Sequence, residues 1–376
     1  MIFVSSVIIF FAVSYAILIL LLWLGFISMQ EVSMKNDNIP SRFLSVVIPF
    51  RNEAGRLAEL VSSLENQSYP TSLFEVIFVN DHSVDNSVSI IERACENNSN
   101  FRLLHIDKDR NGKKASVSLG VENASGTHII QTDADCTFGP QFIEAHGWKI
   151  DNSGAEFISG PVSYKWRQNS FLDQMETIDF LSLAGTGAGS FFYGNPIMCS
   201  GANLSYSKAF YQDAKHFDRR EITPSGDDMF MLIAAKRLKV STSWLKSVKA
   251  VVYTHPTGSL KRFLQQRIRW GSKAKYYIDR DILWIALLVA LTNIVLLLSP
   301  IFIGLWKELW IIVLAGFGLK LIVDFLLLRS VTKFLNQSAL LRLYLPVALL
   351  YYIYFVCVAV ASLFGGIHWK GRVYKT

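Results

Sequence analysis

The chain has 376 residues, of which 51% are hydrophobic and 18% are charged, and its formal net charge is +7. This length allows more than one domain. The four cysteines have no paired spacing, which indicates reduced thiols and excludes a disulfide framework; they are Cys95, Cys136, Cys199 and Cys357. The basic residues adjoin an apolar run and accompany no recognisable nucleic-acid-binding module, so no nucleic-acid partner is expected.

The hydrophobic residues gather at the two ends of the chain. Three runs contain no charged residue, and each exceeds the roughly 20 residues that cross a bilayer; they are residues 2–27, 282–306 and 343–367. A fourth run, 309–328, contains only Lys320 and Asp324, which share a helix face and can neutralise each other. We therefore predict four membrane helices. The first is an uncleaved anchor rather than a secretory signal, because it lacks a basic start and its apolar core is too long.

The distribution of basic residues predicts the orientation in the membrane. Residues 260–280 carry seven basic residues against the single acid Asp279, and the loop 329–342 adds three more. The positive-inside rule places both regions, and the domain between the first two spans, in the cytosol. The basic tail, residues 368–376, would then lie outside against the same rule. Either the last segment re-enters the membrane or the tail is an exception.

Strands and helices alternate between residue 41 and about residue 279. Strands are expected at 43–49, 74–80, 101–106 and 127–132. Helices are expected between them, the first with an apolar face made by Leu57, Leu60, Val61 and Leu64, the second with Val88, Ile91 and Cys95 on one side, and the third over 113–122. This alternation predicts an α/β fold, a doubly wound and mostly parallel sheet. Ligands on such sheets bind beyond the carboxyl ends of the strands.

Acidic residues follow three of the expected strands, in segments 49–53, 81–85 and 133–135. Asp133 and Asp135 are two residues apart on a turn, so both carboxylates can reach one hard cation. Mg²⁺ is commonly held by one or two carboxylates while substrate phosphates complete its shell. An Asp-x-Asp pair on its own is weak evidence of a metal site, because most such pairs are solvated turn residues.

The order of several motifs is more specific than any one of them. The segments 45–53, 79–85 and 133–135 are followed by Ser-Gly-Ala-Asn at 200–203, Gly-Asp-Asp at 226–228 and Gln-x-x-Arg-Trp at 266–270. This series resembles the inverting nucleotide-sugar glycosyltransferases of family 2, which have the GT-A fold. The resemblance covers residues 41–275, and the membrane arrangement looks like that of lipid- or polysaccharide-directed members.

The resemblance implies a role for each motif residue. Asp228 would be the catalytic base and Asp135 the ligand of Mg²⁺ or Mn²⁺, although the family usually has Glu-Asp where this chain has Asp227-Asp228. The nucleotide sugar would be bound by Pro49, Arg51, Glu53, Asp81, Lys113, Asp133, Gln266 and Arg269. The acceptor would be bound by Asn203, Asp227 and Trp270.

Plainer interpretations exist for several of these residues. Asp81 and Asp85 suit turns or helix caps, and Glu53 suits the first turn of a helix. Asp227 and Asp228 also suit a helix start, while Lys113 suits a solvated basic turn. His255 stands alone in the sequence, and a single histidine without partners is more often structural than metal-binding.

Residues 259–280 predict a basic amphipathic helix at the membrane surface. Leu260, Phe263, Leu264 and Ile268 would lie near the membrane, and the basic residues would lie among lipid headgroups. The expected domains are an anchor (1–28), a GT-A domain (41–258), this interfacial helix with the Gln-x-x-Arg-Trp motif (259–280), membrane helices (281–367) and a basic tail (368–376).

The sequence therefore predicts an integral protein of the cell (inner) membrane with a cytosolic catalytic domain. It would transfer a sugar, with UDP as the default carrier by resemblance, to a lipid or lipid-linked glycan. One alternative is a processive polysaccharide synthase that extrudes its polymer. Four spans leave little material for a glycan channel unless the chain forms an oligomer or has an export partner. Another is an inactive membrane scaffold that keeps the fold and only binds.

Overall fold

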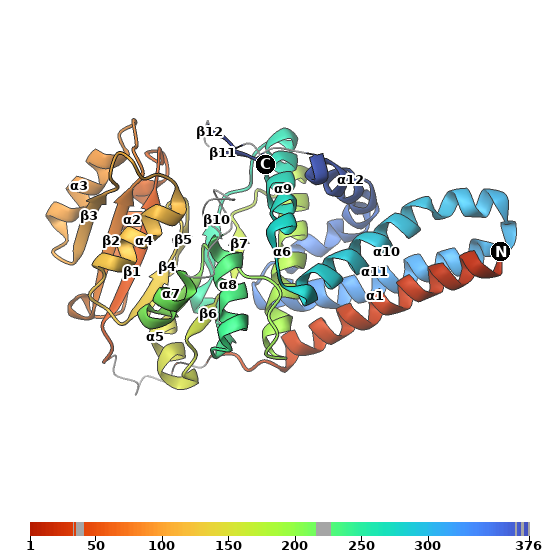
Figure 1. Ribbon diagram of the computed structural model, residues 1–376, viewed down its shortest axis with the longest axis horizontal. Helices are drawn as coiled ribbons and strands as arrows, with labels where there is room; N and C mark the ends of the chain where they lie inside the picture. The colour runs from red at the N-terminus through yellow and green to blue at the C-terminus, as the bar shows by residue number, and fades with distance from the viewer. Residues whose placement is uncertain (33, 35–40, 216–226, 365–366, 370–371, 375–376) are drawn as a thin grey trace. The chain divides into compact units, whose positions relative to one another are not determined.

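The computed structural model describes residues 1–32, 34, 41–215, 227–364, 367–369 and 372–374 (Figure 1). The chain forms two compact units. The sheet unit comprises Met29–Lys165 and Phe191–His255, and the helical unit comprises Met1–Ser28, Trp166–Ser190 and Pro256–Thr376. The segment Trp166–Ser190 lies inside the range expected for the GT-A domain, and it clusters with the apolar helices.

The main sheet of the sheet unit has seven strands in the order β3-β2-β1-β4-β8-β6-β9. Strands β1 to β4 are mutually parallel, and β8 is antiparallel to both of its neighbours. A second sheet has the order β5-β10-β7. The strands are β1 (Leu44–Phe50), β2 (Phe74–Asn80), β3 (Phe101–His105), β4 (His128–Gln131), β5 (Thr137–Phe138), β6 (Phe157–Ser159), β7 (Val162–Tyr164), β8 (Leu204–Ser207), β9 (Thr242–Trp244) and β10 (Val252–Thr254).

Helices separate the parallel strands of this unit, as the sequence predicts for a doubly wound sheet. They are α2 (Leu57–Glu65), α3 (Ser87–Asn97), α4 (Lys113–Asn123), α5 (Phe142–Ser153), α7 (Lys208–Ala214) and α8 (Asp227–Leu238). The buried face of α2 is the predicted set of four residues. On α3, Ile91 is buried as predicted but Ala94 takes the place expected for Cys95.

The core of the sheet unit is built around β1 and β2. All seven residues of each strand are buried, as expected for parallel strands covered on both faces. Helix α4 packs closely on this sheet at Gly120, where an added Cβ would collide with the side chain of Val47. A glycine is therefore required at that position to bring the helix, and the loop before it, against the carboxyl ends of the strands.

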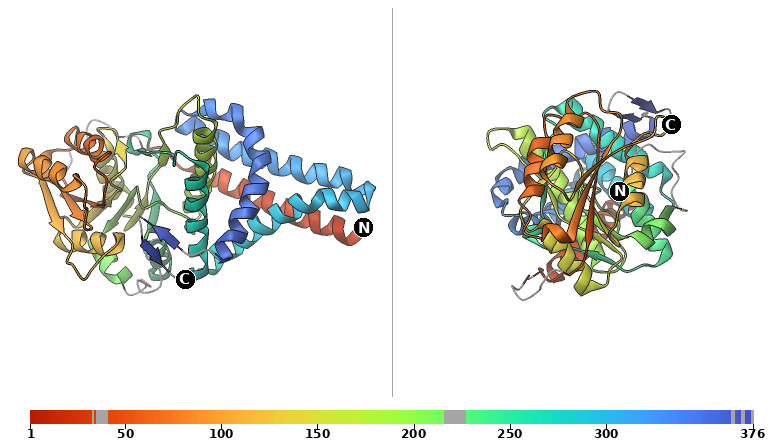
Figure 2. Two further views of the ribbon diagram at one scale, coloured as in Figure 1. Left: turned by 90° about the horizontal axis from the view of Figure 1, so that it is seen from above. Right: turned by 90° about the vertical axis from the view of Figure 1, so that its left-hand side faces the viewer.

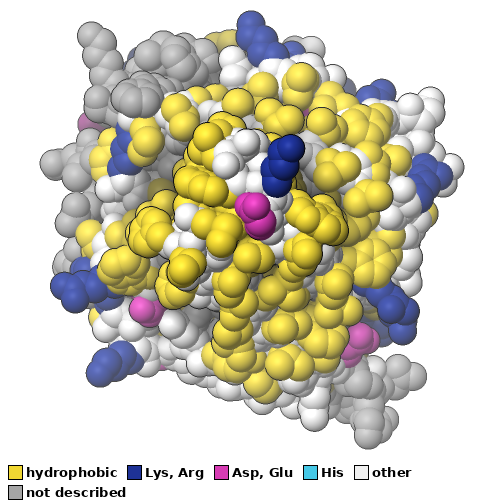
Figure 3. Space-filling model, turned by 90° about the vertical axis from the view of Figure 1, so that its right-hand side faces the viewer, with side chains coloured by type: hydrophobic (Ala, Val, Ile, Leu, Met, Phe, Trp, Pro, Cys, Tyr) yellow, Lys and Arg dark blue, Asp and Glu magenta, His cyan; other side chains and the backbone are white. Residues whose placement is uncertain are grey.

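Among the described residues, the helical unit contains four helices that are long and apolar enough to cross a membrane, in agreement with the predicted number. The corresponding helices are α1 (Ile2–Ser28), α10 (Arg280–Leu305), α11 (Trp310–Phe334) and α12 (Tyr344–Phe364). Helices α1, α10 and α11 run side by side (Figure 2). Hydrophobic side chains predominate on the face where α1 begins (Figure 3). The helical unit also contains most of α6 (Phe171–Phe191), α9 (Leu260–Ser272) and the short strands β11 (Ile367–Trp369) and β12 (Arg372–Tyr374).

The predicted pair within the third apolar helix is present. The Lys320 ammonium lies 2.5 Å from Oδ2 of Asp324, and the Tyr15 hydroxyl donates to Oδ1 of Asp324 at 2.7 Å. The rings of Tyr15, Tyr351 and Tyr352 surround the ammonium at about 5 Å. Ion pairing and aromatic contacts thus compensate the charge of a lysine that is only 4% exposed.

Candidate active site

Two of the predicted nucleotide-binding loops are joined at the carboxyl ends of β1 and β2. The Arg51 guanidinium donates to the carbonyl oxygen of Asp81 at 3.0 Å and lies 3.6 Å from its carboxylate. Pro49 lies beside Val79 in the parallel register. Glu53 follows on the β1 loop, where its backbone N–H donates to the Ser87 hydroxyl at 2.8 Å. The predicted residues at these two strand ends therefore come together.

Asp85 connects the same loops through backbone groups. Its carboxylate accepts from the N–H groups of Ala54 at 3.1 Å and Ser87 at 3.0 Å. Burial raises the pKa of Asp85, but hydrogen bonds from Ser87 and Ala54 outweigh it and leave the pKa below its usual value. The turn and cap interpretation of Asp85 accounts for these contacts.

A second group of predicted residues centres on Lys113. Its ammonium lies 2.5 Å from Oδ1 of Asp133, which follows β4. The same ammonium lies close to Gly201, because a Cβ added there would be only 3.1 Å from it. The Gly201 N–H in turn donates to Oδ2 of Asp228 at 3.2 Å. Residues from four distant parts of the sequence, including the predicted base, thus form one continuous cluster.

Asp228 stands in the first turn of α8, and its Oδ1 accepts from the N–H of Met229 at 2.9 Å. It is partly exposed, and its role as the base stays a prediction. Asp227 begins α8, but its side chain lies outside the described part of the structure, as does Gly226. The acceptor-binding role of Asp227 therefore stays a prediction.

Asn203 is fully buried, and its acceptor-binding role stays a prediction. Its Nδ2 donates to the carbonyl oxygens of Pro161 and Ala250, both at 2.8 Å, and Oδ1 lies 2.9 Å from Nε2 of His146. His146 also contacts the Ser205 hydroxyl at 2.9 Å, and burial lowers its pKa to about 4. The neutral His146 and Asn203 thus support the loop that carries Gly201.

Asp135 has neighbours that sequence reasoning did not single out. Its Oδ2 lies 3.2 Å from the Arg56 guanidinium and accepts from the Thr254 hydroxyl at 3.3 Å. His255 follows Thr254, and burial together with the positive charges of Arg56 and Lys165 lowers the pKa of its imidazole. Arg56 is the residue just before α2, Thr254 ends β10 and His255 follows it, and no spacing in the sequence links them to Asp135.

The chemistry of this edge fits a hard divalent cation. Asp133 and Asp135 supply carboxylate oxygens, which Mg²⁺ and Mn²⁺ prefer. Among the described residues, no three His, Cys, Asp or Glu side chains are grouped closely enough to hold a metal by themselves. A cation here would therefore need oxygens from a substrate, as in diphosphate sites.

The remaining predicted residues lie on α9, in the helical unit. Trp270 packs against Phe180, with ring centroids 6.2 Å apart, and Gln266 accepts from the Arg267 guanidinium at 3.1 Å. The Ser272 hydroxyl donates to the carbonyl oxygen of Arg269 at 3.0 Å. The donor-binding roles of Gln266 and Arg269 and the acceptor-binding role of Trp270 stay predictions, since they concern ligands held by the other unit.

The amphipathic interpretation of α9 is corrected in two places. Phe263 is fully buried and packs edge-on against Tyr354 of α12, so it does not face lipid. Arg267 is also buried, in an ion pair with Asp179, instead of lying among headgroups. Both side chains are held by partners about 90 residues away in the sequence, which helical periodicity does not reveal.

Comparison with known proteins finds a family that resembles part of this chain. The family described as glycosyl transferase family 2 matches residues 45–213, which include β1 to β4, Asp81, the Asp133–Asp135 pair and Gly201. This segment of the chain is similar to that family. The mannosyltransferase PcManGT from Pyrobaculum calidifontis, solved with GDP-Man and Mn²⁺, has the same fold, with a TM-score of 0.60 at 16% identity over 96% of this chain and 99% of that one.

Two curated relatives extend the comparison. An undecaprenyl-phosphate 4-deoxy-4-formamido-L-arabinose transferase of Pseudomonas savastanoi pv. phaseolicola is 32% identical over 105 residues, covering 28% of this chain and 31% of that protein. A poly-beta-1,6-N-acetyl-D-glucosamine synthase of Staphylococcus epidermidis is 22% identical over 257 residues, covering 67% of this chain and 59% of that protein. The chain thus spans between about a third and three fifths of the length of these relatives.

Proposed function

We propose that the protein is a membrane-bound, inverting glycosyltransferase that moves a sugar from a nucleotide-sugar donor to a lipid or lipid-linked glycan. The observation that carries this proposal is the cluster of Asp133, Lys113, Gly201 and Asp228 at the carboxyl edge of a family 2 sheet. Such an edge is where ligands bind in open α/β sheets.

The roles proposed for the residues follow from their chemistry. Arg51 and Asp81 would bind the nucleoside, and Lys113 and Asp133 would face the diphosphate. Asp228 would accept the proton of the acceptor hydroxyl while that oxygen attacks the anomeric carbon. Because the oxygen enters as the diphosphate leaves on the opposite side, the configuration inverts in one displacement.

Divalent metal dependence belongs to the same proposal. Asp135, with Asp133 close by, would hold Mg²⁺ or Mn²⁺. A bound cation supplies Lewis-acid stabilisation of the negative charge that develops on the leaving diphosphate. The partly exposed carboxylate of Asp135 suits this role. The Mn²⁺ in the mannosyltransferase PcManGT supports a divalent ion without fixing which one this protein uses.

The acceptor class is inferred from the membrane helices and from one relative. In the described part of the chain, four helices are long and apolar enough to cross a membrane, so the protein would work at a membrane, with its catalytic domain in the cytosol by the distribution of basic residues. The relative named as an undecaprenyl-phosphate transferase acts on a lipid phosphate. A lipid or lipid-linked glycan is therefore the acceptor that we propose, in the synthesis of a cell-envelope glycan or glycolipid.

The similarity to the poly-N-acetyl-D-glucosamine synthase favours a second candidate, a processive synthase, because it extends over two thirds of the chain. Product length separates the two candidates. Single additions on a lipid support the first, and a ladder of products that lengthens with time supports the second.

The test of the proposal is release of nucleoside diphosphate by detergent-solubilised protein. A panel of nucleotide sugars is incubated with Mn²⁺, Mg²⁺ or EDTA, with and without a lipid extract. We expect metal-dependent release from one donor, lost in Asp135→Ala. If no donor gives release with lipid extract present, and no nucleotide sugar binds by calorimetry, the proposal is wrong.

A further inference from the structure

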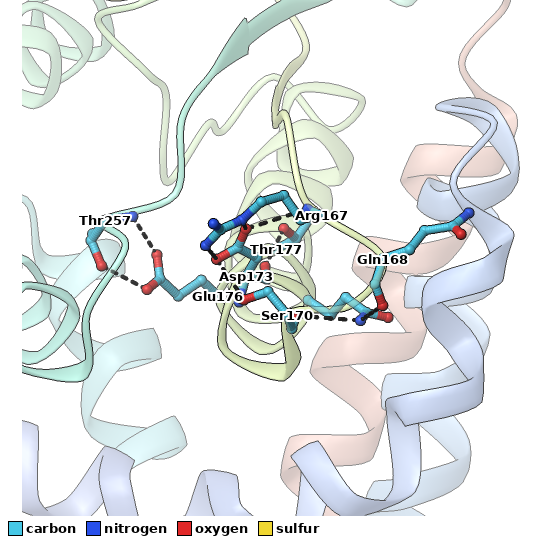
Figure 4. A network of polar contacts seen from close by, with 8 residues as sticks. Arg167, Gln168, Ser170, Asp173, Glu176, Thr177 and Thr257 are labelled. Atoms are coloured by element: carbon cyan, nitrogen blue, oxygen red, sulfur yellow. Dashed lines mark hydrogen bonds and ion pairs between the residues drawn. The ribbon is translucent and has the colours of Figure 1, made fainter.

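Helix α6 carries three acids on one buried face, and each has a different partner. Asp173, Glu176 and Asp179 are 1%, 0% and 5% exposed, and their spacing of three places them in successive turns. Asp173 pairs with Arg167, and Glu176 accepts from the N–H and hydroxyl of Thr257 at 2.8 and 2.6 Å (Figure 4). Asp179 contacts Arg267 on α9. Glu176 therefore holds the segment before α9, and Asp179 holds the helix itself.

Each carboxylate oxygen of Asp179 has a partner, and the two partners come from different helices. Its Oδ2 lies 2.6 Å from Nε of Arg267 on α9, and the two side chains are only 4% and 6% exposed. Its Oδ1 accepts a short hydrogen bond from the Tyr354 hydroxyl on α12. One carboxylate therefore connects α6, α9 and the last apolar helix.

Arg267, which is held by Asp179, also contacts two residues of the Gln266-x-x-Arg269-Trp270 motif. Its Nη1 donates to Oε1 of Gln266 at 3.1 Å, and its guanidinium carbon lies 4.3 Å from the centre of the Trp270 indole ring. A guanidinium is planar and rigid, so fixing its Nε on Asp179 also fixes the direction of its other nitrogens and of its stacking face. Gln266 and Trp270 thus both contact Arg267, which occupies a variable position of the motif.

We propose that Asp179 and Arg267 are positioning residues, which hold the Gln266 amide and the Trp270 indole in the orientation that the transfer needs. This inference rests on the proposed function, because the ligands of Gln266 and Trp270 are part of it. The competing explanation is a purely structural ion pair. Buried ion pairs are weak evidence of stabilisation, because apolar replacements of both partners are often tolerated. That property makes the two explanations separable.

The activity experiment uses a double variant. Asp179→Asn with Arg267→Met removes both charges, so no buried charge is left unpaired and folding should survive. Gln266 and Trp270 nevertheless lose their anchor. The matched control, Asp173→Asn with Arg167→Met, removes the other ion pair of α6, whose arginine lies just before α6 and not on α9. We expect kcat to fall about 10- to 100-fold in the first variant and less than about 2-fold in the control, as misplacement without loss of a group implies.

Measuring the thermal midpoint together with the kinetic constants separates positioning from a purely structural ion pair. We expect the two double variants to have similar thermal midpoints while only Asp179→Asn/Arg267→Met changes kcat and the acceptor KM. Arg267→Lys should stay impaired, since lysine cannot hold Asp179, Gln266 and the indole face at once. A double variant that regains both the midpoint and the wild-type kcat would show that the pair is only structural and would overturn the inference.

A second readout does not depend on activity. Protein labelled with 5-fluorotryptophan gives one ¹⁹F signal per tryptophan, and the Trp270 signal is the one missing from Trp270→Phe. We expect this signal to shift or broaden in Asp179→Asn/Arg267→Met and to stay in place in the control. An unmoved Trp270 signal would refute positioning, whether or not any sugar transfer is observed. If the Trp270 signal moves in the double variant but the wild-type protein transfers no sugar, the proposed function is wrong instead.

Discussion

The backbone N–H of Gly201 donates to Oδ2 of Asp228 across 3.2 Å, and an added Cβ on Gly201 would lie 3.1 Å from the Lys113 ammonium. This contact joins the first turn of α8 to the loop before β8 and to the start of α4. It holds the predicted base beside the predicted diphosphate site, although 115 positions separate Lys113 from Asp228 in the sequence (228 minus 113). The proposed chemistry depends on this juxtaposition.

Replacing Asp228 with Asn should remove the base and keep the fold. Asparagine can still accept from the Gly201 N–H, so the loop is retained, but a neutral amide cannot take the acceptor proton. We expect transfer to fall by about 10²- to 10⁴-fold, the usual contribution of a general base, with unchanged donor affinity by calorimetry. The control is Asp213→Asn, an exposed acid on α7. Transfer at the wild-type rate in Asp228→Asn would contradict the base assignment.

Lys113→Met should weaken donor binding. Methionine keeps much of the apolar stem but removes the charge that pairs with Asp133 and that would meet the diphosphate. We expect the donor Kd to rise about 10-fold, which corresponds to about 1.4 kcal/mol. Lys114→Met is the comparison, since Lys114 is buried and its ammonium lies over the Phe230 ring at 4.5 Å. Equal donor affinity in Lys113→Met and wild-type protein would exclude Lys113 from the donor site.

Lys320→Met should destabilise the helical unit. The variant leaves Asp324 without its cation among apolar helices, and breaking a buried pair by removing one partner costs about 3–5 kcal/mol. We expect a lower thermal midpoint in detergent and partial recovery in Lys320→Met/Asp324→Leu, where no charge remains. If the single and double variants melt together with the wild type, the pair has no stabilising role.

Acid should destabilise the protein through His146. Burial holds the folded pKa at about 4, below the ordinary value of 6.5, so the unfolded chain binds more protons between those pH values. The stability that neutral His146 contributes is therefore complete above pH 6.5 and is lost as the pH falls toward 4. Between pH 7 and pH 5 the loss is about 2 kcal/mol.

His146→Gln isolates this effect, because glutamine stays neutral and can still donate to Asn203. Thermal midpoints are measured for both proteins from pH 7 to pH 5. We expect the wild-type midpoint to fall more steeply with acid than that of the variant. Parallel curves would mean that His146 is not the group responsible.

The elements that the sequence predicts well are those with strong periodicity. Strands β1 and β2 are buried and mostly apolar runs, and α2 buries the four predicted residues. Strands β5, β7 and β10 have only two or three residues each, too few to show a period, yet β10 brings Thr254 to Asp135. Local pattern therefore predicts the sheet, and it does not predict the neighbours of the metal-binding candidate.

Arg267 shows a second limit of sequence reasoning. Its position on a basic amphipathic helix favours exposure to headgroups, and the rule fails because Asp179, 88 positions away, compensates its charge. The burial of Asn203 is a similar case, since its hydrogen-bond partners His146, Pro161 and Ala250 all lie in distant segments. Pairing between distant segments decides burial in both cases, and a single sequence carries no signal for such pairing.

The most direct test of glycosyl transfer is the movement of label into lipid. Membranes containing the protein are incubated with a radiolabelled nucleotide sugar and Mn²⁺, and the label in the organic extract is counted against EDTA and against Asp228→Asn. We predict label in the extract that EDTA and Asp228→Asn both abolish. Label that enters the extract equally with Asp228→Asn, or no label from any sugar nucleotide in extract or polymer, would contradict the proposed function.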